Sequence, residues 1–402
     1  MKVKLVIVGG GQAAVSLVSK LKNNNYEGDI SIICGEPYLP YQRPPLSKSY
    51  LLNKIEMSRL FLKPQSFYDE KDINIRLGTK ATSIDRKNKC LYIGKEQLKY
   101  ENLVLATGSV PNYLPKHITN GIKNIFSIRN IDDVLELKDK FSKSQSVLVV
   151  GGGYIGLEAA AVCIKKGLKV KLVEGGCRIL QRVACSETST YLERIHQSHG
   201  VEICKNLTVS SMRTKGKKVV ATFSDKTSFE CDFVISGIGI SPDTALANKA
   251  GIKLENGIWT NSLGRTSDEN IWAIGDCASF PVENKSIRLE SVGHAIDHAE
   301  TIAVNLTGGN ISYIPKPWFW SDQYDIKLQI AGLNTGYNHI VERKTAEDII
   351  SFWYFKSNDL LAVDAINAPR DYMIGKRLIE SGISPDKKIL SDPKNNLKTL
   401  LL

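Results

Sequence analysis

The hydrophobic pattern of the chain predicts strands and helices in alternation up to about residue 317. Apolar runs at residues 3–8, 30–33, 147–150 and 169–173 are typical of strands buried on both faces of a sheet. Helical segments follow several of these runs, and such alternation favours an α/β fold with parallel sheets. The other expected elements are strands near residues 73–77, 90–93, 103–105, 201–203, 219–223, 233–235 and 271–274, and helices ending near residue 22 or covering residues 129–145, 186–199 and 288–306.

The pattern changes near residue 318. Ile326, Leu328 and Ile330 alternate with polar residues, which is typical of a strand with one buried face. The expected elements are a hairpin of residues 349–355 and 360–366 and a closing helix over residues 372–381. An antiparallel sheet with a helix would make this part a separate α+β domain. The tail from Pro385 is rich in lysine and asparagine, and we expect it to be mobile.

Residues 146–174 carry the most informative motif. A buried strand leads into Gly151, Gly153 and Gly156 in the spacing G-x-G-x-x-G, an alanine-rich helix follows, and a second strand ends in Glu174. Glycines at these positions permit a tight turn, close approach of the backbone to a pyrophosphate, and close packing of the helix on its strand. The helix N-terminus favours phosphate, and the acid can accept hydrogen bonds from a ribose. The stretch therefore predicts a dinucleotide site.

Residues 3–36 repeat this arrangement. Gly9, Gly11 and Ala14 form G-x-G-x-x-A after the first strand, and the next strand leads to Glu36. Both copies keep every required element, so we expect two working dinucleotide sites.

Weaker signals lie in loops. Arg43 and Lys48 belong to a proline-stiffened loop, and their charges fit a bound cofactor and a solvated loop equally well. Thr107 and Gly108 follow a buried strand, where small residues let the backbone approach a ligand. Asp276 follows another strand and can bind a ribityl hydroxyl or cap the next element.

The amino-acid composition narrows the classes of protein to which the chain can belong. The chain has 402 residues, room for two or three domains, with 42% hydrophobic and 24% charged residues. No stretch approaches the about 18 uninterrupted apolar residues of a membrane span, so we expect none. The first expected strand begins at Val3, which leaves no room for a cleavable signal peptide, so we expect a cytoplasmic location. The eight scattered cysteines indicate reduced packing residues. The net charge of +11 suits a lysine-rich surface or a basic face.

No metal site is expected. His294 and His298 lie at i and i+4, but no third ligand and no H-E-x-x-H glutamate accompany them. No nucleic-acid partner is expected either, since we find no recognition helix or base-stacking motif.

The chain resembles the FAD-dependent, NADH-using ferredoxin reductases of bacterial cytochrome P450 and ring-hydroxylating oxygenase systems over essentially its whole length. The segments that carry the resemblance are Arg43–Lys48, Ala106–Gly108, Gly151–Glu158, Gly275–Asp276, Glu290–Val292, Pro317–Gln323 and Ala362–Ala365. The resemblance implies a glutathione-reductase-like α/β architecture with two Rossmann-like domains. The two are a FAD-binding domain of residues 1–112 and 244–317 and a NAD-binding domain of residues 113–243. A C-terminal α+β domain of residues 318–402 follows them.

The resemblance also implies roles for individual residues. Asp276 would bind ribityl or pyrophosphate oxygens of FAD, and the Val292 amide would meet the isoalloxazine ring. Lys48 and Glu158 would form an ion pair where nicotinamide stacks on the flavin, and Trp320 would lie against the flavin. These last three are the predicted catalytic residues. The predicted cofactor-binding residues are Gly9, Gly11, Ala13, Ala14, Glu36, Arg43, Lys48, Ala81, Thr107, Gly108, Arg129, Gly151, Gly153, Ile155, Gly156, Glu158, Glu174, Arg182, Gly239, Gly275, Asp276, Val292 and Trp320.

Two departures matter. Related flavin disulfide reductases carry a redox C-x-x-x-x-C pair where this chain has residues 44–48, so electrons have no protein disulfide to visit. His294 stands where relatives usually carry another polar residue.

NADH delivers two electrons together, an iron–sulfur protein accepts one, and a flavin can do both. The expected function is reduction by NADH, through FAD, of a [2Fe–2S] ferredoxin that serves a P450 or oxygenase, with an acidic ferredoxin as partner and the reductase a monomer or weak dimer. Rubredoxin reductase, monodehydroascorbate reductase and NADH oxidase are alternatives of the same fold. A redox-gated binding protein resembling apoptosis-inducing factor is an alternative of another class.

Overall fold

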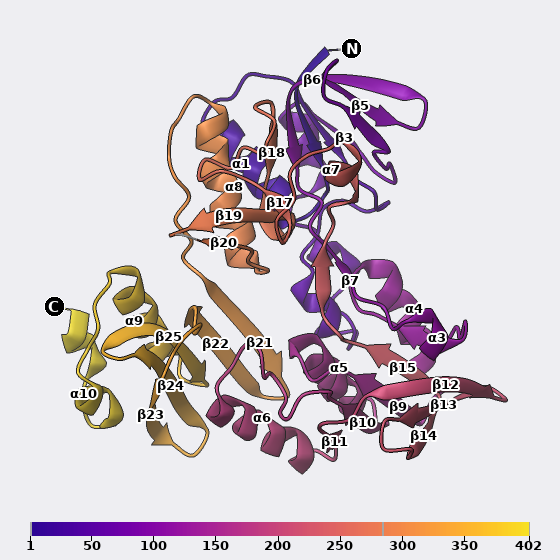
Figure 1. Cartoon of the computed structure of the whole chain (residues 1–402), viewed down its shortest axis with the longest axis vertical. Helices are drawn as coiled ribbons and strands as arrows, with labels where there is room; N and C mark the ends of the chain where they lie inside the picture. Colours follow the sequence, from indigo (N-terminus) through magenta and orange to yellow (C-terminus); the bar gives the residue numbers. More distant parts are fainter. Residues whose placement is uncertain (1, 284, 402) are drawn as a thin grey trace. The chain divides into compact units, whose positions relative to one another are not determined.

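The computed structural model describes residues 2–283 and 285–401, which form two compact units (Figure 1). Unit 1 consists of Met1–Gln42, Met57–Val110 and Ser241–Pro317. Unit 2 consists of Arg43–Glu56, Pro111–Ile240 and Trp318–Leu402.

Unit 1 is built on a mixed sheet. Its strands run in the order β3-β2-β1-β6-β5-β4, and β18 pairs with the second half of β6. The strands are β1 Lys2–Val8, β2 Ile30–Ile33, β3 Ile73–Arg76, β4 Ser83–Asp85, β5 Cys90–Ile93, β6 Glu96–Leu105 and β18 Ile271–Ala273. Strands β3, β2, β1, β6 and β18 pair with their neighbours in parallel. Strand β5 pairs antiparallel with both β6 and β4. Val8 lies opposite both Ile33 and Leu105, so three strands end at one edge.

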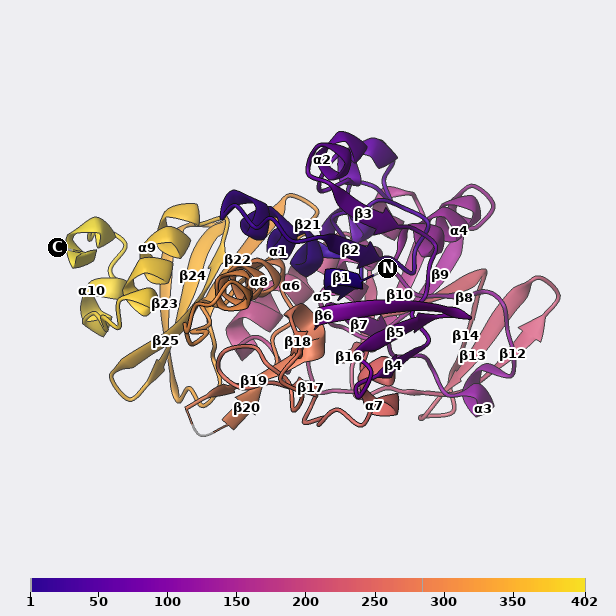
Figure 2. The ribbon, with the colours of Figure 1, turned by 90° about the horizontal axis from the view of Figure 1, so that it is seen from above.

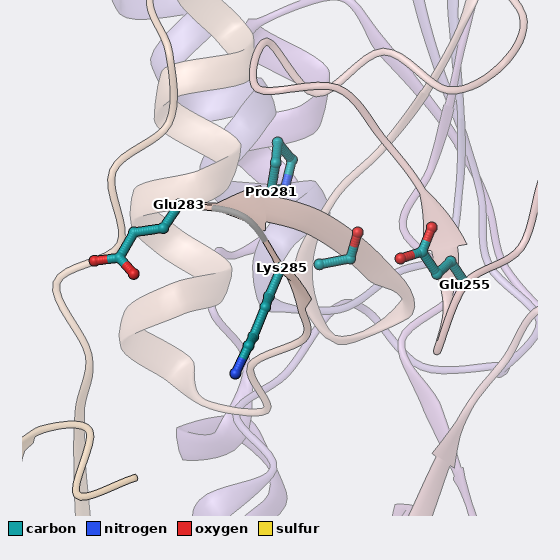
Figure 3. A pocket seen from close by; sticks show the side chains of 5 residues that line it. Glu255, Pro281, Glu283 and Lys285 are labelled. Carbon is teal, nitrogen blue, oxygen red and sulfur yellow. The ribbon is translucent and has the colours of Figure 1, made fainter. Parts of the chain in front are cut away.

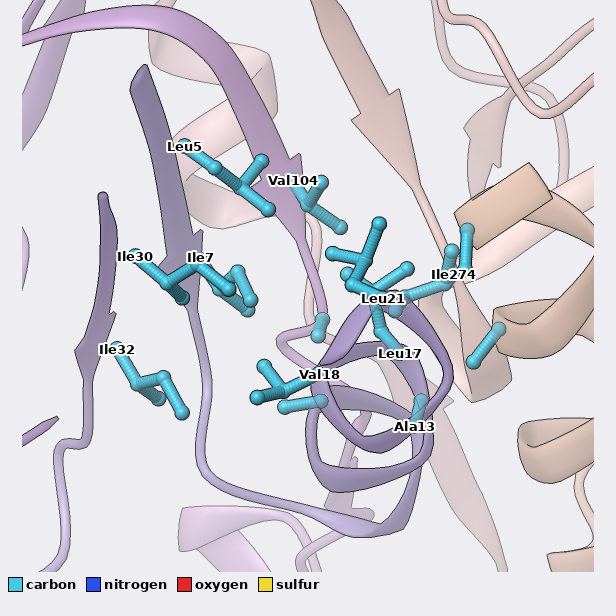
Figure 4. Close-up of a cluster of buried hydrophobic side chains, with 14 of the residues drawn as sticks. Leu5, Ile7, Ala13, Leu17, Val18, Leu21, Ile30, Ile32, Val104 and Ile274 are labelled. Carbon is cyan, nitrogen blue, oxygen red and sulfur yellow. The ribbon is translucent and has the colours of Figure 1, made fainter. Parts of the chain in front are cut away.

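Helices α1 (Gln12–Asn23) and α8 (Val292–Leu306) pack side by side in this unit (Figure 2). Leu17, Val18 and Leu21 of α1 are fully buried in a cluster that includes Ile7 and Val104 of the sheet (Figure 4). Burying each such aliphatic side chain contributes about 1.5–3 kcal/mol. This core fixes the position of the α1 N-terminus against the ends of the strands.

Smaller elements complete unit 1. They are α2 Gln65–Glu70, α7 Ala245–Lys249, the 3-10 turns η2 Met57–Leu60 and η3 Gly275–Cys277, and the three-stranded sheet of β17 Ile258–Trp259, β19 Ala278–Val282 and β20 Lys285–Ile287. Strands β7 (Ser109–Pro111) and β16 (Ile240–Pro242) lie where the chain passes from one unit to the other.

Unit 2 contains a five-stranded parallel sheet in the order β11-β10-β9-β15-β8. Its strands are β8 Ile125–Phe126, β9 Ser146–Val150, β10 Lys169–Val173, β11 Glu202–Cys204 and β15 Phe233–Ser236. The other elements of this part are η1 Pro44–Ser47, α3 Lys116–Thr119, α4 Ile131–Phe141, α5 Tyr154–Lys165, α6 Ser186–Ser198 and the antiparallel strands β12 Val209–Lys215, β13 Lys218–Phe223 and β14 Ser228–Cys231.

The C-terminal part of unit 2 is an antiparallel sheet in the order β21-β22-β25-β24-β23. The strands are β21 Trp318–Gln323, β22 Ile326–Gly332, β23 His339–Ala346, β24 Ile349–Lys356 and β25 Asp359–Ile366. Helix α9 (Pro369–Glu380) packs on β25 and β22. The predicted hairpin and the change to antiparallel pairing are confirmed.

The prediction of a mobile tail was wrong. The tail forms α10 (Lys387–Ser391) and the 3-10 turn η4 (Leu397–Leu401), and Leu390 and Leu397 are buried. The buried Arg343 side chain donates hydrogen bonds to four backbone carbonyls of this segment, those of Leu390, Asp392, Pro393 and Asn395. The lysine and asparagine content of the tail could not reveal a partner that lies on β23.

Several predicted boundaries shift for local reasons. Helix α4 begins after Asn130 because Asn130 and Asp133 form a capping box. Helix α8 begins at Val292, since Ser291 accepts a hydrogen bond from the amide of His294. The proline-rich loop contains the short 3-10 turn η1 where only irregular structure was expected.

No helix within residues 2–283 and 285–401 is both long and apolar enough to cross a bilayer.

Candidate active site

The first glycine motif lies between β1 and α1 in unit 1. Gly9 has φ +116°, and a Cβ there would lie 2.1 Å from the carbonyl oxygen of Ala106, so only glycine fits. Gly11 is the N-cap residue of α1, and a Cβ there would have no atom within 4 Å. A helix N-terminus that opens onto free space, without a side-chain cap from Gly11, suits the phosphates of a dinucleotide.

Two acids and one turn adjoin this motif. Glu36 follows β2 and accepts a hydrogen bond from the hydroxyl of Tyr41. Gly275, with φ +71°, begins η3, and a Cβ there would lie 3.0 Å from the Cβ of Ala13 on α1. Close approach at Gly275 brings Asp276 to the first motif, and the Ser109 hydroxyl donates to its carboxylate at 3.0 Å. The structure thus brings together the predicted phosphate and ribityl ligands of unit 1.

Other predicted residues have mainly structural contacts. The Thr107 hydroxyl donates to the carbonyl of Asp243 at 2.6 Å, and Ala81 packs against a buried cluster of unit 1. In unit 2, the Arg43 guanidinium donates to the carbonyl of Arg129 at 2.7 Å, which brings these two predicted residues together.

The second glycine motif lies between β9 and α5 in unit 2. A Cβ on Gly151, which has φ +105°, would lie 2.5 Å from the carbonyl oxygen of Gly237, and a Cβ on Gly156 would lie 2.0 Å from that of Gly151. Gly153, the N-cap residue of α5, again faces free space. The two motifs therefore share the same construction, and both suit a dinucleotide phosphate.

Glu174 and two arginines are the candidate residues for binding the ribose of unit 2. The Glu174 carboxylate accepts hydrogen bonds from the amides of Gly152 and Gly176, both at 2.7 Å. Arg178 donates to Ser189, to the carbonyl of Cys185 and to that of Gln181, so it serves the protein's own structure. Arg182 is exposed, and its Nη2 atom would lie 3.5 Å from a Cβ on Gly239.

A buried ion pair follows the second motif. Glu158, on α5, is 2% exposed, and its Oε1 atom lies 2.7 Å from the Nζ atom of Lys48. The Ser47 hydroxyl donates to Oε2 at 2.5 Å, and the Ser321 hydroxyl donates to Oε1 at 2.6 Å. Burial raises the pKa of Glu158, while the charge of Lys48 and the hydrogen bonds from Lys48, Ser321 and Ser47 oppose that shift. The sequence predicted the Lys48–Glu158 pair and missed both serines, although each serine adjoins a predicted residue.

Trp320, the third predicted catalytic residue, is half-buried on β21 and stacks on Trp318 with ring centroids 5.5 Å apart. Tyr154, the first residue of α5, is half-buried with its hydroxyl oxygen buried, and it packs against Phe319 at 4.7 Å between ring centroids. Successive side chains of a strand point to opposite faces, so Trp320 and Ser321 lie on opposite faces of β21. Ser321 is the one that points to Glu158.

His294 and His298 belong to an aromatic cluster in unit 1. Their rings stack with centroids 5.0 Å apart, beside Phe280 and Tyr313. Burial lowers the pKa of His294 to about 4 and holds that of His298 well below its usual value, so both are neutral near pH 7. Among the residues that the structure describes, no three His, Cys, Asp or Glu side chains are placed to hold a metal ion.

A surface pocket of about 640 Å³ lies beside β19 and β20 (Figure 3). Its lining consists of Glu255, Pro281, Glu283, Lys285 and Ser286. Its two carboxylates and its lysine are on exposed residues. None of its lining residues belongs to the predicted cofactor sites.

Two dinucleotide-type motifs and a buried Lys–Glu pair define an oxidoreductase of the two-dinucleotide class. The family described as "Pyridine nucleotide-disulphide oxidoreductase" matches residues 3–299, and the "Reductase C-terminal" family matches residues 318–401. The chain belongs to the pyridine nucleotide-disulphide oxidoreductase family, whose members use a flavin and a nicotinamide nucleotide.

Its relatives agree with this assignment. The chain is 35% identical to rhodocoxin reductase of Rhodococcus erythropolis, over 96% of this chain and 92% of the relative. It is also 35% identical to putidaredoxin reductase of Pseudomonas putida, over 99% and 96%. Among solved structures, the ferredoxin reductase for the CYP199A2 system of Rhodopseudomonas palustris matches with a TM-score of 0.95 and 33% identity, covering 98% of this chain and 99% of that one. The predicted family and fold class are confirmed.

Proposed function

We propose that this protein is a FAD-dependent NADH:[2Fe–2S] ferredoxin reductase that supplies a cytochrome P450 or another oxygenase. The observation that carries the proposal is the pair of glycine motifs accompanied by the buried Lys48–Glu158 ion pair, whose lysine stands in the segment where related disulfide reductases carry their redox cysteines. All eight cysteines are free thiols, six of them buried, so none of them is paired in a disulfide. The named functions of the relatives support the same reaction, since putidaredoxin reductase also matches in its covalent complex with putidaredoxin, at a TM-score of 0.94.

The residues of unit 1 fit FAD. The α1 amides would hold the pyrophosphate, Glu36 the adenosine ribose and Asp276 the ribityl chain, while the Val292 amide at the start of α8 would meet the isoalloxazine ring. A bound flavin accepts two electrons from NADH and releases them singly, which matches the two carriers. We propose residues 1–112 and 244–317 as the FAD-binding domain.

The residues of unit 2 fit NADH. The α5 amides would hold its pyrophosphate, and Glu174 would hold its ribose. Lys48 and Glu158 would line the nicotinamide position, where a neutralised ion pair gives a polar but uncharged wall. We propose residues 113–243 as the NAD-binding domain and residues 318–402 as the C-terminal domain.

NADH should be strongly preferred over NADPH. The Glu174 carboxylate would repel a 2′-phosphate, and Arg178 cannot offset that repulsion because its guanidinium is engaged within the protein. The measurement is kcat/KM for both coenzymes, in the wild type and in Arg182→Ala. We expect a wild-type preference of at least about tenfold, unaltered in Arg182→Ala. Equal efficiency with both coenzymes would contradict the ribose assignment of Glu174.

Ferredoxin reduction should slow as salt rises. The net charge of +11 attracts an acidic ferredoxin over distances that salt screens beyond about 8 Å at physiological ionic strength. The test compares NADH-dependent reduction of a [2Fe–2S] ferredoxin, below saturation, with reduction of a neutral quinone. We expect only the ferredoxin rate to fall with salt. Failure to reduce any [2Fe–2S] ferredoxin, while quinone is reduced, would overturn the proposed function.

A rubredoxin reductase is the second candidate. The rubredoxin-NAD(+) reductase of Ectopseudomonas oleovorans is 32% identical over 91% of this chain and 96% of the relative. The same assay with rubredoxin as acceptor separates the two, because the preferred iron protein should show the higher kcat/KM.

A further inference from the structure

The Ser321 contact with Glu158 is one end of a longer chain of buried hydrogen bonds in unit 2. The Ser321 hydroxyl accepts from the Gln323 amide nitrogen at 3.0 Å. The Gln323 carbonyl oxygen lies 2.8 Å from Nε2 of His196, and Nδ1 of His196 lies 3.2 Å from the hydroxyl of Tyr324. Ser321, Gln323 and His196 are each at most 2% exposed. The chain thus links the buried Glu158 to α6 through strand β21.

Strand geometry explains how β21 supplies two residues, Ser321 and Gln323, to this series of hydrogen bonds. Side chains at i and i+2 point to the same face of a strand, so Ser321 and Gln323 face inward together. Asp322, between them, is exposed on the opposite face. Glu158 and His196 come from helices α5 and α6 of the same unit.

Every hydrogen bond in this series, from Tyr324 to Glu158, has a fixed direction. A carbonyl oxygen can only accept, so the proton of His196 is on Nε2, and Nδ1 accepts from Tyr324. The Gln323 amide then donates to Ser321, and Ser321 donates its one proton to Glu158. All four donors therefore point toward one carboxylate. Hydrogen bonds aligned in this way polarise one another.

We propose that Ser321, Gln323 and His196 are positioning residues, which hold the Glu158 carboxylate in its ion pair with Lys48. The inference rests on the proposed function in one respect, namely that this ion pair lines the nicotinamide position. It goes beyond that function by assigning the orientation of the pair to the C-terminal strand β21. The Gln323 amide lies in the middle of this series of hydrogen bonds, so the series orients and polarises the Glu158 carboxylate rather than conducting protons.

The charged surroundings of Glu158 are simple. Lys48, next to η1, is the cation that faces it, and Tyr154 on its own helix is a neutral phenol whose pKa burial raises. Burial lowers the pKa of His196 to about 4, with a smaller contribution from His199, so His196 is neutral near pH 7. Protonation of Glu158 therefore depends on burial, on Lys48 and on the donors from Ser47 and Ser321.

The experiment follows the protonated carboxyl band of Glu158 by infrared spectroscopy of the flavin-loaded protein as pH varies. Glu158→Gln identifies the band by its loss. Asp364→Asn identifies the band of another buried carboxyl, whose pKa burial raises to about 6. We expect Ser321→Ala to move the Glu158 midpoint upward by about one pH unit, a tenfold change in its ionisation constant. Gln323→Leu should move it upward by less, and Ser321→Thr, which keeps the hydroxyl, should restore it.

Asp322→Asn is the matched control, since it changes the neighbouring outward-facing residue of the same strand. A Ser321→Ala midpoint equal to that of Asp322→Asn would overturn the proposal. If Ser321→Ala fails to retain flavin, the Gln323→Leu variant becomes the test. A Glu158 midpoint that is unchanged in Gln323→Leu would show that Gln323 and His196 do not act on Glu158, and the proposal would be wrong. Absence of ferredoxin reduction by the wild type would instead overturn the proposed function and leave the infrared midpoints unaffected.

Discussion

Gly11→Trp should give a protein without bound flavin, whereas Gly153→Trp should keep its flavin and lose reduction by NADH. Both glycines are N-cap residues of 12-residue helices, and a Cβ at either position has no atom within 4 Å. A tryptophan therefore fills the space before each helix without a backbone clash at its Cβ. Because the two sites have the same local geometry, each variant is the matched control for the other.

The measurements are flavin absorbance per chain, thermal unfolding and flavin bleaching by NADH without oxygen. We expect the Gly11→Trp protein to be colourless, and the Gly153→Trp protein to be yellow with a bleaching rate at least about 100-fold lower, since misplacement of a reactant can cost that much. Loss of flavin in both variants, or in Gly153→Trp alone, would contradict the assignment of the two motifs.

Glu158→Gln should lower the rate of flavin reduction by NADH by about ten- to 100-fold with little loss of flavin. The glutamine keeps the shape of the side chain but removes the charge that pairs with Lys48 at 2.7 Å. A buried cation without its partner is costly, so Lys48 should turn away from the nicotinamide position or lose its proton.

The pH dependence gives a second readout. The pKa of Glu158 is raised by burial, so the ion pair is present above that pKa and is lost as pH falls through it. Flavin reduction in the wild type should therefore slow on the acid side at a higher pH than an ordinary glutamate would give, and Glu158→Gln should lack this limb. Glu202→Gln is the control, because Glu202 pairs with Lys171 at 2.6 Å with its side chain half exposed. An acid limb that survives in Glu158→Gln would assign it to another group.

Local chemistry in the sequence determined the architecture of both motifs. Glycine is required where a Cβ would strike a carbonyl, as at Gly9 and Gly151, and buried strands need long apolar runs, so these features are readable without a fold. The position of Glu158 came instead from the family resemblance, because the local pattern alone fits a solvent-facing residue at the start of a helix equally well.

Only the tertiary structure decided what surrounds Glu158. Ser321 and Gln323 lie more than 160 residues from it, and no periodicity links a serine on an edge strand to a glutamate on a helix. Likewise, Arg343 on β23 orders a tail whose composition predicted disorder. Local patterns report which backbone states and burials a segment favours, whereas the partner of a polar group depends on which distant segments pack together. The sequence alone therefore determined the two dinucleotide motifs and, through the family resemblance, the candidate ion pair. Packing decided the donors that hold this pair and the order of the C-terminal segment.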